Sequence, residues 1–538
     1  MQRPSSRTVV ISIALVLFVA CCLLPIAYLL IIPLGSGTIA YGDLRLDARQ
    51  QGLLRNTTLL GAGTALLATG IGAPLGLALA RVPFTRKTLL RVALAAPVLL
   101  PPYIMALSWT YLGGTRGFVA TLVGSDVIAE WTYSLPAAIA VLSLVFYPLS
   151  MLAAEVAIRR IDGRLEEAAS LVAPPHLALR RITLPLAAPG VLAGALVIFV
   201  LAVSEFSVPG LLRVRVYTTE VFTAFAALYD FGRAVLLAIP LLVLCLVIAT
   251  IAVTIVGERH VSTNRGLDTG AAVLADWRRP AGAAALATLA LALALPLLVL
   301  VREALGAESL RGIVEGSGRA IANSLLFACI GATAVVGVAV WLGYARARAR
   351  ARVGQLADVL FVFAFAVPST IVGVGLIGLW NRPGLLGAVY GSDAMFVLAY
   401  LARFVPVAAL AIAAVTRYVP VSHEEAAAVS GAGWLRTMTH IVLPQVRLGI
   451  LIAWVIAFVL AFGELGVSIL VAPPGEATLP IRIYTLIANA PPSHVAILAL
   501  LQTAVVLTPL GILASLISRR PSTRAQGPPN EADGRVAR

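Results

Sequence analysis

The sequence predicts an all-α, polytopic membrane protein with about twelve transmembrane helices in two parallel six-helix repeats. Of its 538 residues, 60% are hydrophobic and only 12% are charged, whereas an average soluble domain has ~25% charged residues. The apolar residues form runs long enough to cross ~30 Å of hydrocarbon as helices, and these runs lack the alternation of β-barrel strands. Landmarks of the first half also recur, in the same order, in the second half.

Twelve apolar runs account for the predicted spans. The first six lie at residues 9–32, 53–80, 89–113, 134–157, 186–208 and 234–256, and the second six at 281–301, 321–344, 356–380, 394–416, 448–472 and 494–517. The first run follows two arginines, as a secretory signal does, but it is longer than the apolar core of a signal and has no clear cleavage site. We therefore expect it to be retained as the first span.

Paired landmarks define the internal repeat. Asn56 and Asn323 open equivalent spans, and Pro101 and Pro368 interrupt the spans that follow; each pair is 267 positions apart. Six spans per copy bring both copies into the membrane from the same side, which makes the repeat parallel. We expect a first repeat at 1–257, a cytoplasmic linker at 258–280, a second repeat at 281–518 and a disordered cytoplasmic tail at 519–538.

The positive charge of the chain fits a membrane better than a nucleic acid. The net charge is +15, but the basic residues lie in short loops between apolar runs. We expect membrane lipid as a partner and no nucleic acid. Most of these residues fall on the side of the N-terminus, so the positive-inside rule places both termini in the cytoplasm.

A polar loop with the same pattern occurs once in each half. In the second half, residues 417–444 contain Glu425-Ala426-Ala427, then Gly431, then Leu443-Pro444. Alanine favours helix, glycine permits a turn with positive φ, and proline suits a first helical turn. We therefore predict two short helices separated by a turn, with the proline starting the next span.

The copy in the first half, at residues 158–185, contains Glu167, Ala168 and Ala169 and ends at Pro185. It has Ala173-Pro174-Pro175 in place of the glycine turn and is one residue shorter. A single loop of this kind would read as a capped amphipathic segment at the membrane surface. Its repetition with nearly the same spacing favours two docking surfaces for a cytoplasmic partner.

On these residues the chain resembles the permease subunit of bacterial ATP-binding-cassette (ABC) importers, with two permease domains of type I architecture fused in one chain. The resemblance implies a bacterial plasma-membrane protein whose two loops are coupling helices seated on a cytoplasmic ABC ATPase dimer. It also implies that an extracytoplasmic solute-binding protein delivers the cargo. The fused form and the paired segments around Glu205 and Glu464 resemble the ferric-iron type, so Fe(III) is the expected cargo; thiamine or another small solute is the alternative.

Four residues are candidates for the translocation pathway. Glu205 and Glu464 lie at matching places in spans 5 and 11, and a carboxylate in an apolar span usually faces a cavity or a partner. Pro101 and Pro368 interrupt spans 3 and 9, and broken helices can line a pathway. The alternatives are that the glutamates mark the membrane boundary and that the prolines serve packing alone.

The remaining residues do not suggest an enzyme. Lys87 is the only lysine and the sequence has no Walker motif, so we expect a partner ATPase to use the ATP. The histidines and cysteines lack the spacing of metal ligands, and we expect this chain to bind no metal or cofactor. An ion-coupled secondary transporter is the main rival, and a membrane-embedded enzyme is the second.

Overall fold

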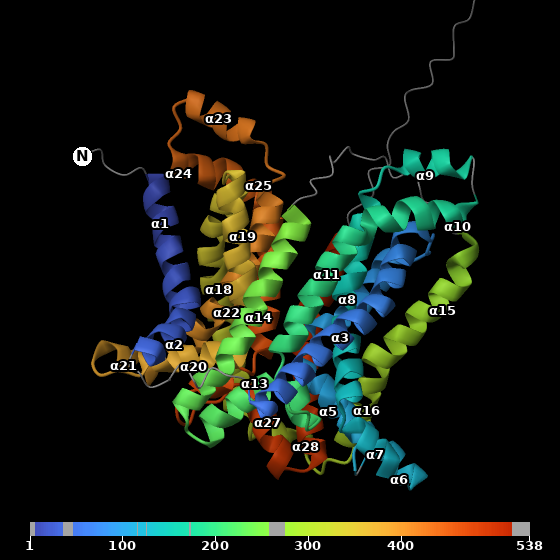
Figure 1. The fold of residues 1–538 in the computed structure, drawn as a ribbon, viewed down its shortest axis with the longest axis vertical. Helices are drawn as coiled ribbons and strands as arrows, with labels where there is room; N and C mark the ends of the chain where they lie inside the picture. The colour runs from blue at the N-terminus through green and yellow to red at the C-terminus, as the bar shows by residue number, and fades with distance from the viewer. Residues whose placement is uncertain are drawn as a thin grey trace, which may run out of the picture.

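The computed structural model describes residues 6–35, 47–115, 117–124, 126–171, 174–257 and 275–518, and over these ranges the chain is helical with no strand. Most of the predicted linker and the whole predicted tail, residues 258–274 and 519–538, lie outside the described residues. The described helices form one bundle (Figure 1).

The first half contains the elements α1 (Ser6–Phe18), η1 (Val19–Leu23), α2 (Leu24–Gly35), α3 (Ala48–Arg81), α4 (Lys87–Ala95), η3 (Ala96–Leu99), α5 (Pro102–Gly113), α6 (Phe118–Val123), α7 (Asp126–Thr132), α8 (Leu135–Arg159), α9 (Gly163–Ser170), α10 (Pro175–Ala178), η4 (Leu179–Thr183), α11 (Leu184–Ser204), α12 (Ser207–Leu211), α13 (Tyr217–Phe222), η5 (Thr223–Ala227) and α14 (Phe231–Gly257).

The second half contains η6 (Ala275–Trp277), α15 (Arg278–Leu289), η7 (Ala290–Ala294), α16 (Leu295–Ala304), α17 (Leu310–Glu315), α18 (Gly318–Ala347), α19 (Ala351–Ala366), α20 (Ser369–Trp380), α21 (Leu385–Tyr390), α22 (Ala394–Thr416), α23 (Val421–Val429), α24 (Trp434–Thr437), η8 (Met438–Val442), α25 (Leu443–Gly463), α26 (Ser468–Val471), α27 (Leu479–Asn489) and α28 (Pro492–Ser518).

The spans agree with the sequence prediction. Ten helices among the described residues are long and apolar enough to cross a membrane, and the number reaches twelve when two sharply bent pairs are each counted as one span. These pairs are α4–α5, bent by 88°, and α19–α20, bent by 93°. They are the third and ninth predicted spans.

Proline chemistry explains both bends. Leu100 and Val367 are extended, with ψ of 132° and 127°, and each precedes the proline that caps the next helix, Pro101 or Pro368. A proline ring disfavours the α conformation in the residue before it, and proline itself donates no backbone hydrogen bond. The predicted interruption of these two spans is confirmed.

Equivalent hydrogen bonds occur in the two halves, near the start of the second and eighth spans. Asn56 donates to the Arg215 carbonyl at 3.1 Å, and Asn323 donates to the Ala477 carbonyl at 3.3 Å. The next residue accepts a backbone bond in each half: Thr57 from the Tyr217 amide, at 3.0 Å, and Ser324 from the Leu479 amide, at 2.6 Å. Each bond ties the start of a long span to the segment that follows the fifth or eleventh span. The internal repeat therefore extends to individual contacts.

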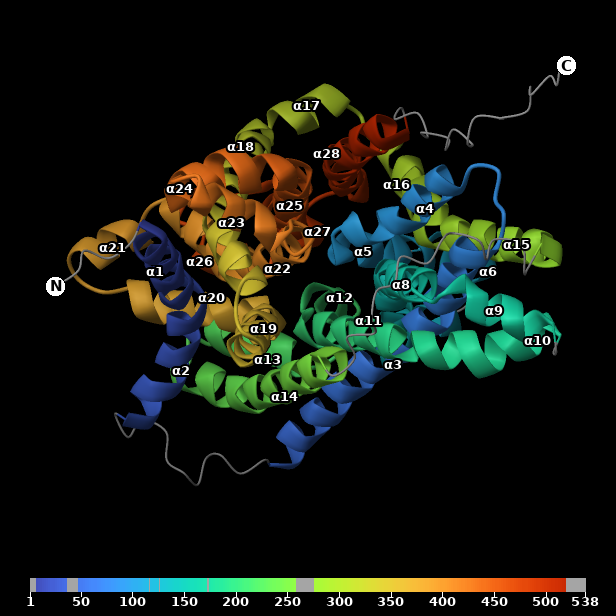
Figure 2. The ribbon, with the colours of Figure 1, turned by 90° about the horizontal axis from the view of Figure 1, so that it is seen from above.

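The first span of each half packs against the other half. Helix α1 contacts α18 and α2 contacts α20, while α15 contacts α3 and α16 contacts α5. Figure 2 shows α1 beside the second-half helices and α15 on the opposite side, beside the first-half helices. The largest hydrophobic cluster likewise joins Tyr103 and Phe206 of the first half to second-half residues. The halves therefore share one interior.

Candidate functional site

Both polar loops lie at one end of the molecule. In Figure 1, α9 and α10 of the first loop and α23 and α24 of the second lie at the end of the bundle where α1 begins. The first loop is α9, α10 and η4; the second is α23, α24 and η8. Gly431, with φ of +80°, makes the turn of the second loop, as predicted, because a side chain there would be strained. The corresponding turn of the first loop includes Val172 and Ala173, which lie outside the described residues.

An arginine–glutamate ion pair ties each loop to the end of a long span. Arg81, the last residue of α3, binds Glu166 with a 3.0 Å Nε–O contact. Arg348, the C-cap of α18, binds Glu424 with a 2.7 Å Nη2–O contact. Both arginines occupy the same place in the repeat, and each glutamate directly precedes the Glu-Ala-Ala motif. The two pairs are therefore equivalent.

Burial makes these pairs structurally important. The Arg81 and Glu166 side chains are 8% and 5% exposed, and those of Arg348 and Glu424 are 9% and 16% exposed. Each arginine also donates to a backbone carbonyl near its loop, that of Ile158 at 3.1 Å or Val419 at 2.9 Å. Removal of one member would leave a buried charge unpaired, which is strongly destabilising. The loops are thus fixed rigidly to α3 and α18.

The surroundings of the two glutamates differ. Glu166 accepts a 2.7 Å hydrogen bond from the Thr183 hydroxyl, within its own loop. Glu424 accepts a 2.6 Å hydrogen bond from the Tyr344 hydroxyl, which belongs to α18. The Trp434 indole in turn donates to the Tyr344 oxygen at 3.3 Å. The second loop is therefore held by a longer network, which includes both of its short helices.

The predicted loop residues divide into exposed and buried groups. Ala168, Pro185, Glu425, Ala426, Gly431 and Pro444 are exposed; Ala169 and Leu443 are half-buried; and Ala427 is buried. Glu167 lies in α9, but its side chain is outside the described residues. Leu171 and Val429, at equivalent positions, are 87% and 90% exposed. Each loop therefore presents one aliphatic side chain and the first alanine of its motif, Ala168 or Ala426, to the outside.

One predicted detail of the loops is wrong. Pro185 and Pro444 do not start new helices, because one continuous helix runs over 176–204 in the first half and over 434–463 in the second. A π turn, η4 or η8, directly precedes each proline-containing helix. The wider π turn changes the hydrogen-bond spacing and thereby accommodates a residue that donates no backbone bond. The spacing of residues in the loop motif does not indicate this π turn.

The structure brings the four predicted pathway residues into two junctions between the halves. At one junction, the end of α11 meets the break of span 9, since the Ser204 hydroxyl, next to Glu205, donates to the Ala366 carbonyl at 2.7 Å, two residues before Pro368. At the other, a Cβ on Gly463, next to Glu464, would lie 3.0 Å from Pro101 Cγ. Each glutamate thus lies close to the break of the opposite half.

The two glutamates also shape the backbone at these junctions. Glu205 is the C-cap of α11 and accepts a 2.8 Å hydrogen bond from the Ser207 amide, while Glu464 is the C-cap of α25 and accepts a 3.0 Å hydrogen bond from the Val467 amide. Both side chains are half-buried. The capping role and a pathway role are therefore compatible.

Three functional candidates were missed by the sequence reasoning. The Glu166 and Glu424 ion pairs belong to the loops, and their signal was present, because Arg81 and Arg348 stand 267 positions apart. Arg403, a buried arginine within α22, has no basic counterpart in the first half, so the repeat gave no signal for it. Among the described residues, no three His, Cys, Asp or Glu side chains gather as a metal site.

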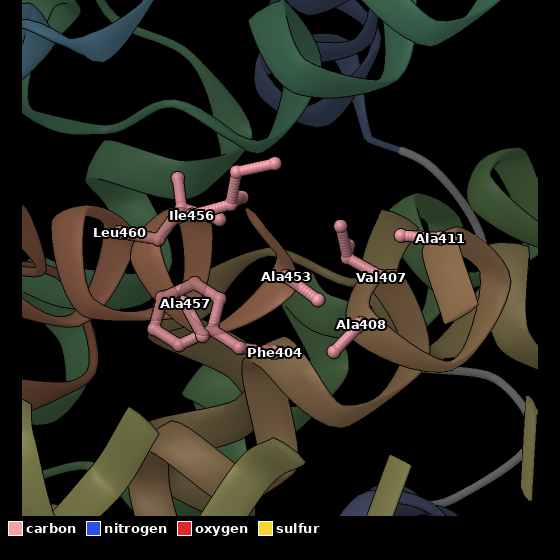
Figure 3. Close-up of a pocket in the computed structure, with 8 residues that line it drawn as sticks. All are labelled: Phe404, Val407, Ala408, Ala411, Ala453, Ile456, Ala457 and Leu460. Carbon is pink, nitrogen blue, oxygen red and sulfur yellow. The ribbon is translucent and has the colours of Figure 1, made fainter. Parts of the chain in front are cut away.

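An apolar groove separates α22 from α25 in the second half. Figure 3 shows its lining: Phe404, Val407, Ala408, Ala411, Ala453, Ile456, Ala457 and Leu460. The equivalent helices of the first half, α8 and α11, are tightly packed, since a Cβ on Gly194 would lie 2.9 Å from the Ala153 methyl. The groove has no polar lining side chain and carries no recognition chemistry of its own.

The chain matches one protein family twice. The family is described as "Binding-protein-dependent transport system inner membrane component", and the matches cover residues 72–261 and 335–523. Each match includes one polar loop and the four spans around it.

Several transport proteins are similar to this chain. It is 21% identical over 468 residues to the Fe(3+)-transport system permease protein of Haemophilus influenzae, which covers 86% of this chain and 89% of that protein. It is 21% identical over 436 residues to the ferric transport system permease protein of Actinobacillus pleuropneumoniae, covering 76% and 63%. It is 30% identical over 129 residues to the molybdenum transport system permease protein of Escherichia coli, covering 24% and 56%.

Proposed function

Because this chain belongs to the family of binding-protein-dependent transport system inner membrane components, we propose that it is the transmembrane permease of an ATP-driven Fe(III) importer. The observation that carries this proposal is the pair of equivalent loops, each fixed to a long span by a buried arginine–glutamate pair. The two repeats, 1–257 and 281–518, supply the two halves that other importers assemble from separate permease subunits. The chain lies in the bacterial plasma membrane with both termini in the cytoplasm.

The loops transmit the work of a separate ATPase dimer. ATP is hydrolysed on that partner, and this chain contributes no cofactor of its own. The contact surface consists of the loop residues Glu167, Ala168, Ala169, Glu425, Ala426 and Gly431, with Pro185, Leu443 and Pro444 at the exits. Ala427 belongs to the same motif but is buried within the second loop. Since Arg81 and Arg348 join the loops to α3 and α18, a displacement of a loop moves its long span. The halves then alternate between outward and inward access.

The cargo is Fe(III), delivered by an extracytoplasmic binding protein. Two relatives that align with most of this chain are ferric permeases, whereas the molybdenum relative aligns with a quarter of it. Glu205 and Glu464 contribute two carboxylates near the breaks of spans 3 and 9, and hard oxygen ligands suit a trivalent cation. We place these glutamates, with Pro101 and Pro368, along the translocation pathway.

Uptake measurements test the cargo and the pathway together. Cells with and without this chain are given labelled Fe(III), thiamine or molybdate, and we expect only Fe(III) uptake to depend on the chain. The double variant Glu205→Gln with Glu464→Gln should lower that uptake by about tenfold, since it removes both charges from the pathway. Glu315→Gln is the matched control, because Glu315 forms an exposed pair with Arg311.

Co-purification tests the docking surface. We expect an ATPase to accompany the chain when it is purified from its host, and Glu425→Arg together with Gly431→Val should abolish this association. Uptake that continues on an ion gradient without nucleotide would contradict the proposal and favour a secondary transporter. Full Fe(III) uptake in the double glutamine variant would remove the glutamates from the pathway but leave the docking surface intact.

A further inference from the structure

The break in span 9 leaves backbone carbonyls without helical partners. Helix α19 ends at Ala366 and α20 begins at Ser369. The last carbonyls of α19 therefore have no backbone amide in a following helical turn from which to accept a hydrogen bond. Inside a membrane no water replaces those bonds, and each unpaired carbonyl is costly. Donors must therefore come from neighbouring helices.

Arg403 of α22 donates two of the hydrogen bonds that these carbonyls accept. Its Nη1 atom donates to the Val367 carbonyl at 2.6 Å and to the Phe365 carbonyl at 3.3 Å. The residue is 7% exposed, and its guanidinium carbon lies 5.8 Å from the centre of the Phe365 ring. None of the ion pairs found over the described ranges includes Arg403. A buried charge is thus stabilised by the negative end of a helix rather than by a carboxylate.

The carbonyl between these two receives its donors from the other half. Ala366 accepts a 2.7 Å hydrogen bond from the Ser204 hydroxyl of α11 and a 3.2 Å bond from the Cys245 thiol of α14. Three consecutive carbonyls therefore bind side chains from three helices and both halves.

The first half has no arginine at the position equivalent to Arg403, beside its own broken span. Phe146 and Pro148 correspond to Phe404 and Pro406, which places Val145 where Arg403 stands. There the break is approached by the 3-10 turn η3, in which the Leu100 amide donates to the Pro97 carbonyl at 3.1 Å. The Tyr147 hydroxyl donates to the Leu94 carbonyl, further back in the helix, at 2.8 Å. Both of these bonds lie within the first half.

We propose that Arg403 is a positioning residue for transport: it holds the break of span 9 in the shape that Ser204 and Cys245 of the other half bind, and so makes this break the joint through which the halves move together. It acts through the backbone and does not touch the cargo. The inference follows from the contacts of span 9 and does not depend on which solute is carried.

Thiol labelling tests the joint without any transport assay. Cys21, Cys22 and Cys329 are replaced by Ala, which leaves Cys245, 2% exposed, as the single thiol, and the purified chain is treated with N-ethylmaleimide. We expect Arg403→Leu to speed labelling of Cys245 by about tenfold, because loss of a charged donor frees the break. Arg403→Lys should restore slow labelling in part, since an ammonium keeps the positive charge and its donors but is carried on a flexible stem and is more strongly hydrated. Tyr147→Phe, the matched change in the first half, should leave the labelling rate unchanged.

Transport measurements then separate positioning from general stability. In the complex purified with its ATPase, we expect Arg403→Leu to lower uptake per ATP hydrolysed by about tenfold while hydrolysis continues, and Arg403→Lys to recover part of that ratio. Equal losses of uptake and hydrolysis, or slow labelling of Cys245 in Arg403→Leu, would overturn the proposal. If no ATPase accompanies the chain, the proposed function fails, yet the labelling rates still decide the role of Arg403.

Discussion

The two polar loops have equivalent ion pairs, but the side chains that hydrogen-bond each glutamate differ. Both connect a glutamate before the Glu-Ala-Ala motif to an arginine at the end of a long span. The first pair is the more deeply buried and is assisted by Thr183, whereas the second is extended by Tyr344 and Trp434. The common feature is the rigid attachment of loop to span, which is what transmission of force requires.

The largest effect is expected from breaking the first pair. Arg81→Leu leaves Glu166 buried with the Thr183 hydroxyl as its remaining side-chain donor, and stranding one partner of a buried pair costs about 3–5 kcal/mol. We expect Fe(III) uptake to fall at least tenfold. Arg348→Leu should reduce it less, because Glu424 is more exposed and retains the Tyr344 hydroxyl.

Two further variants make this comparison decisive. The charge exchange Arg81→Glu with Glu166→Arg should recover part of the uptake, since opposite charges again face each other. Arg311→Leu should leave uptake unchanged, because the Arg311–Glu315 pair is 88% and 63% exposed and such pairs contribute ~0–1 kcal/mol. A greater loss from Arg348→Leu than from Arg81→Leu would show that the network, not burial, determines the strength of attachment.

A second comparison concerns helix packing beside the loops. In the first half, Gly190 and Gly194 of α11 lie against Ala157 and Ala153 of α8, with Cβ approaches of 2.7 and 2.9 Å. In the second half Val415 takes the place of Ala157, and a Cβ on Gly449 would lie 2.7 Å from its side chain. The bulkier valine is consistent with the looser packing of α22 and α25, which leaves the groove of Figure 3.

Leucine substitutions distinguish the two packings. Gly194→Leu should lower the thermal unfolding midpoint in detergent, because overpacking costs about 1–3 kcal/mol. Ala453→Leu, at the equivalent position, extends into the groove and should change the midpoint little. If both variants lower the unfolding midpoint equally, the prediction is wrong, because the two helix pairs would then be packed alike.

The spans and the repeat were predictable because they depend on local composition and spacing. Twelve apolar runs, two interrupting prolines and a glycine turn each have a physical cause within a few residues. Arg81 and Arg348 stand 267 positions apart, so the sequence also carries the signal of their equivalence. Together these features predict that the two polar loops lie on the same side of the membrane.

Contacts between distant residues were not predictable in the same way. Arg91 and Asp358 occupy equivalent positions but carry opposite charges; Arg91 pairs with Glu155 of α8, and Asp358 with Arg346 of α18. The packing of each first span on the opposite half, and the contact of Arg403 with the break of span 9, also join segments far apart in the chain. A single sequence shows which side chains are present, but not which residue of another helix each of them contacts.

The smallest effect should come from Tyr344→Phe, which removes one neutral donor from Glu424 and leaves Arg348 bound. A hydrogen bond to a charged group contributes about 1.5–3 kcal/mol, and the retained arginine compensates for part of it. We expect a few-fold faster tryptic cleavage after Arg436, in the second loop, as its attachment loosens. Cleavage after Arg180 or Arg181, exposed in the first loop, serves as the internal control and should be unchanged. Equal acceleration in both loops would mean that Tyr344 stabilises the whole bundle and that the second loop has no network of its own.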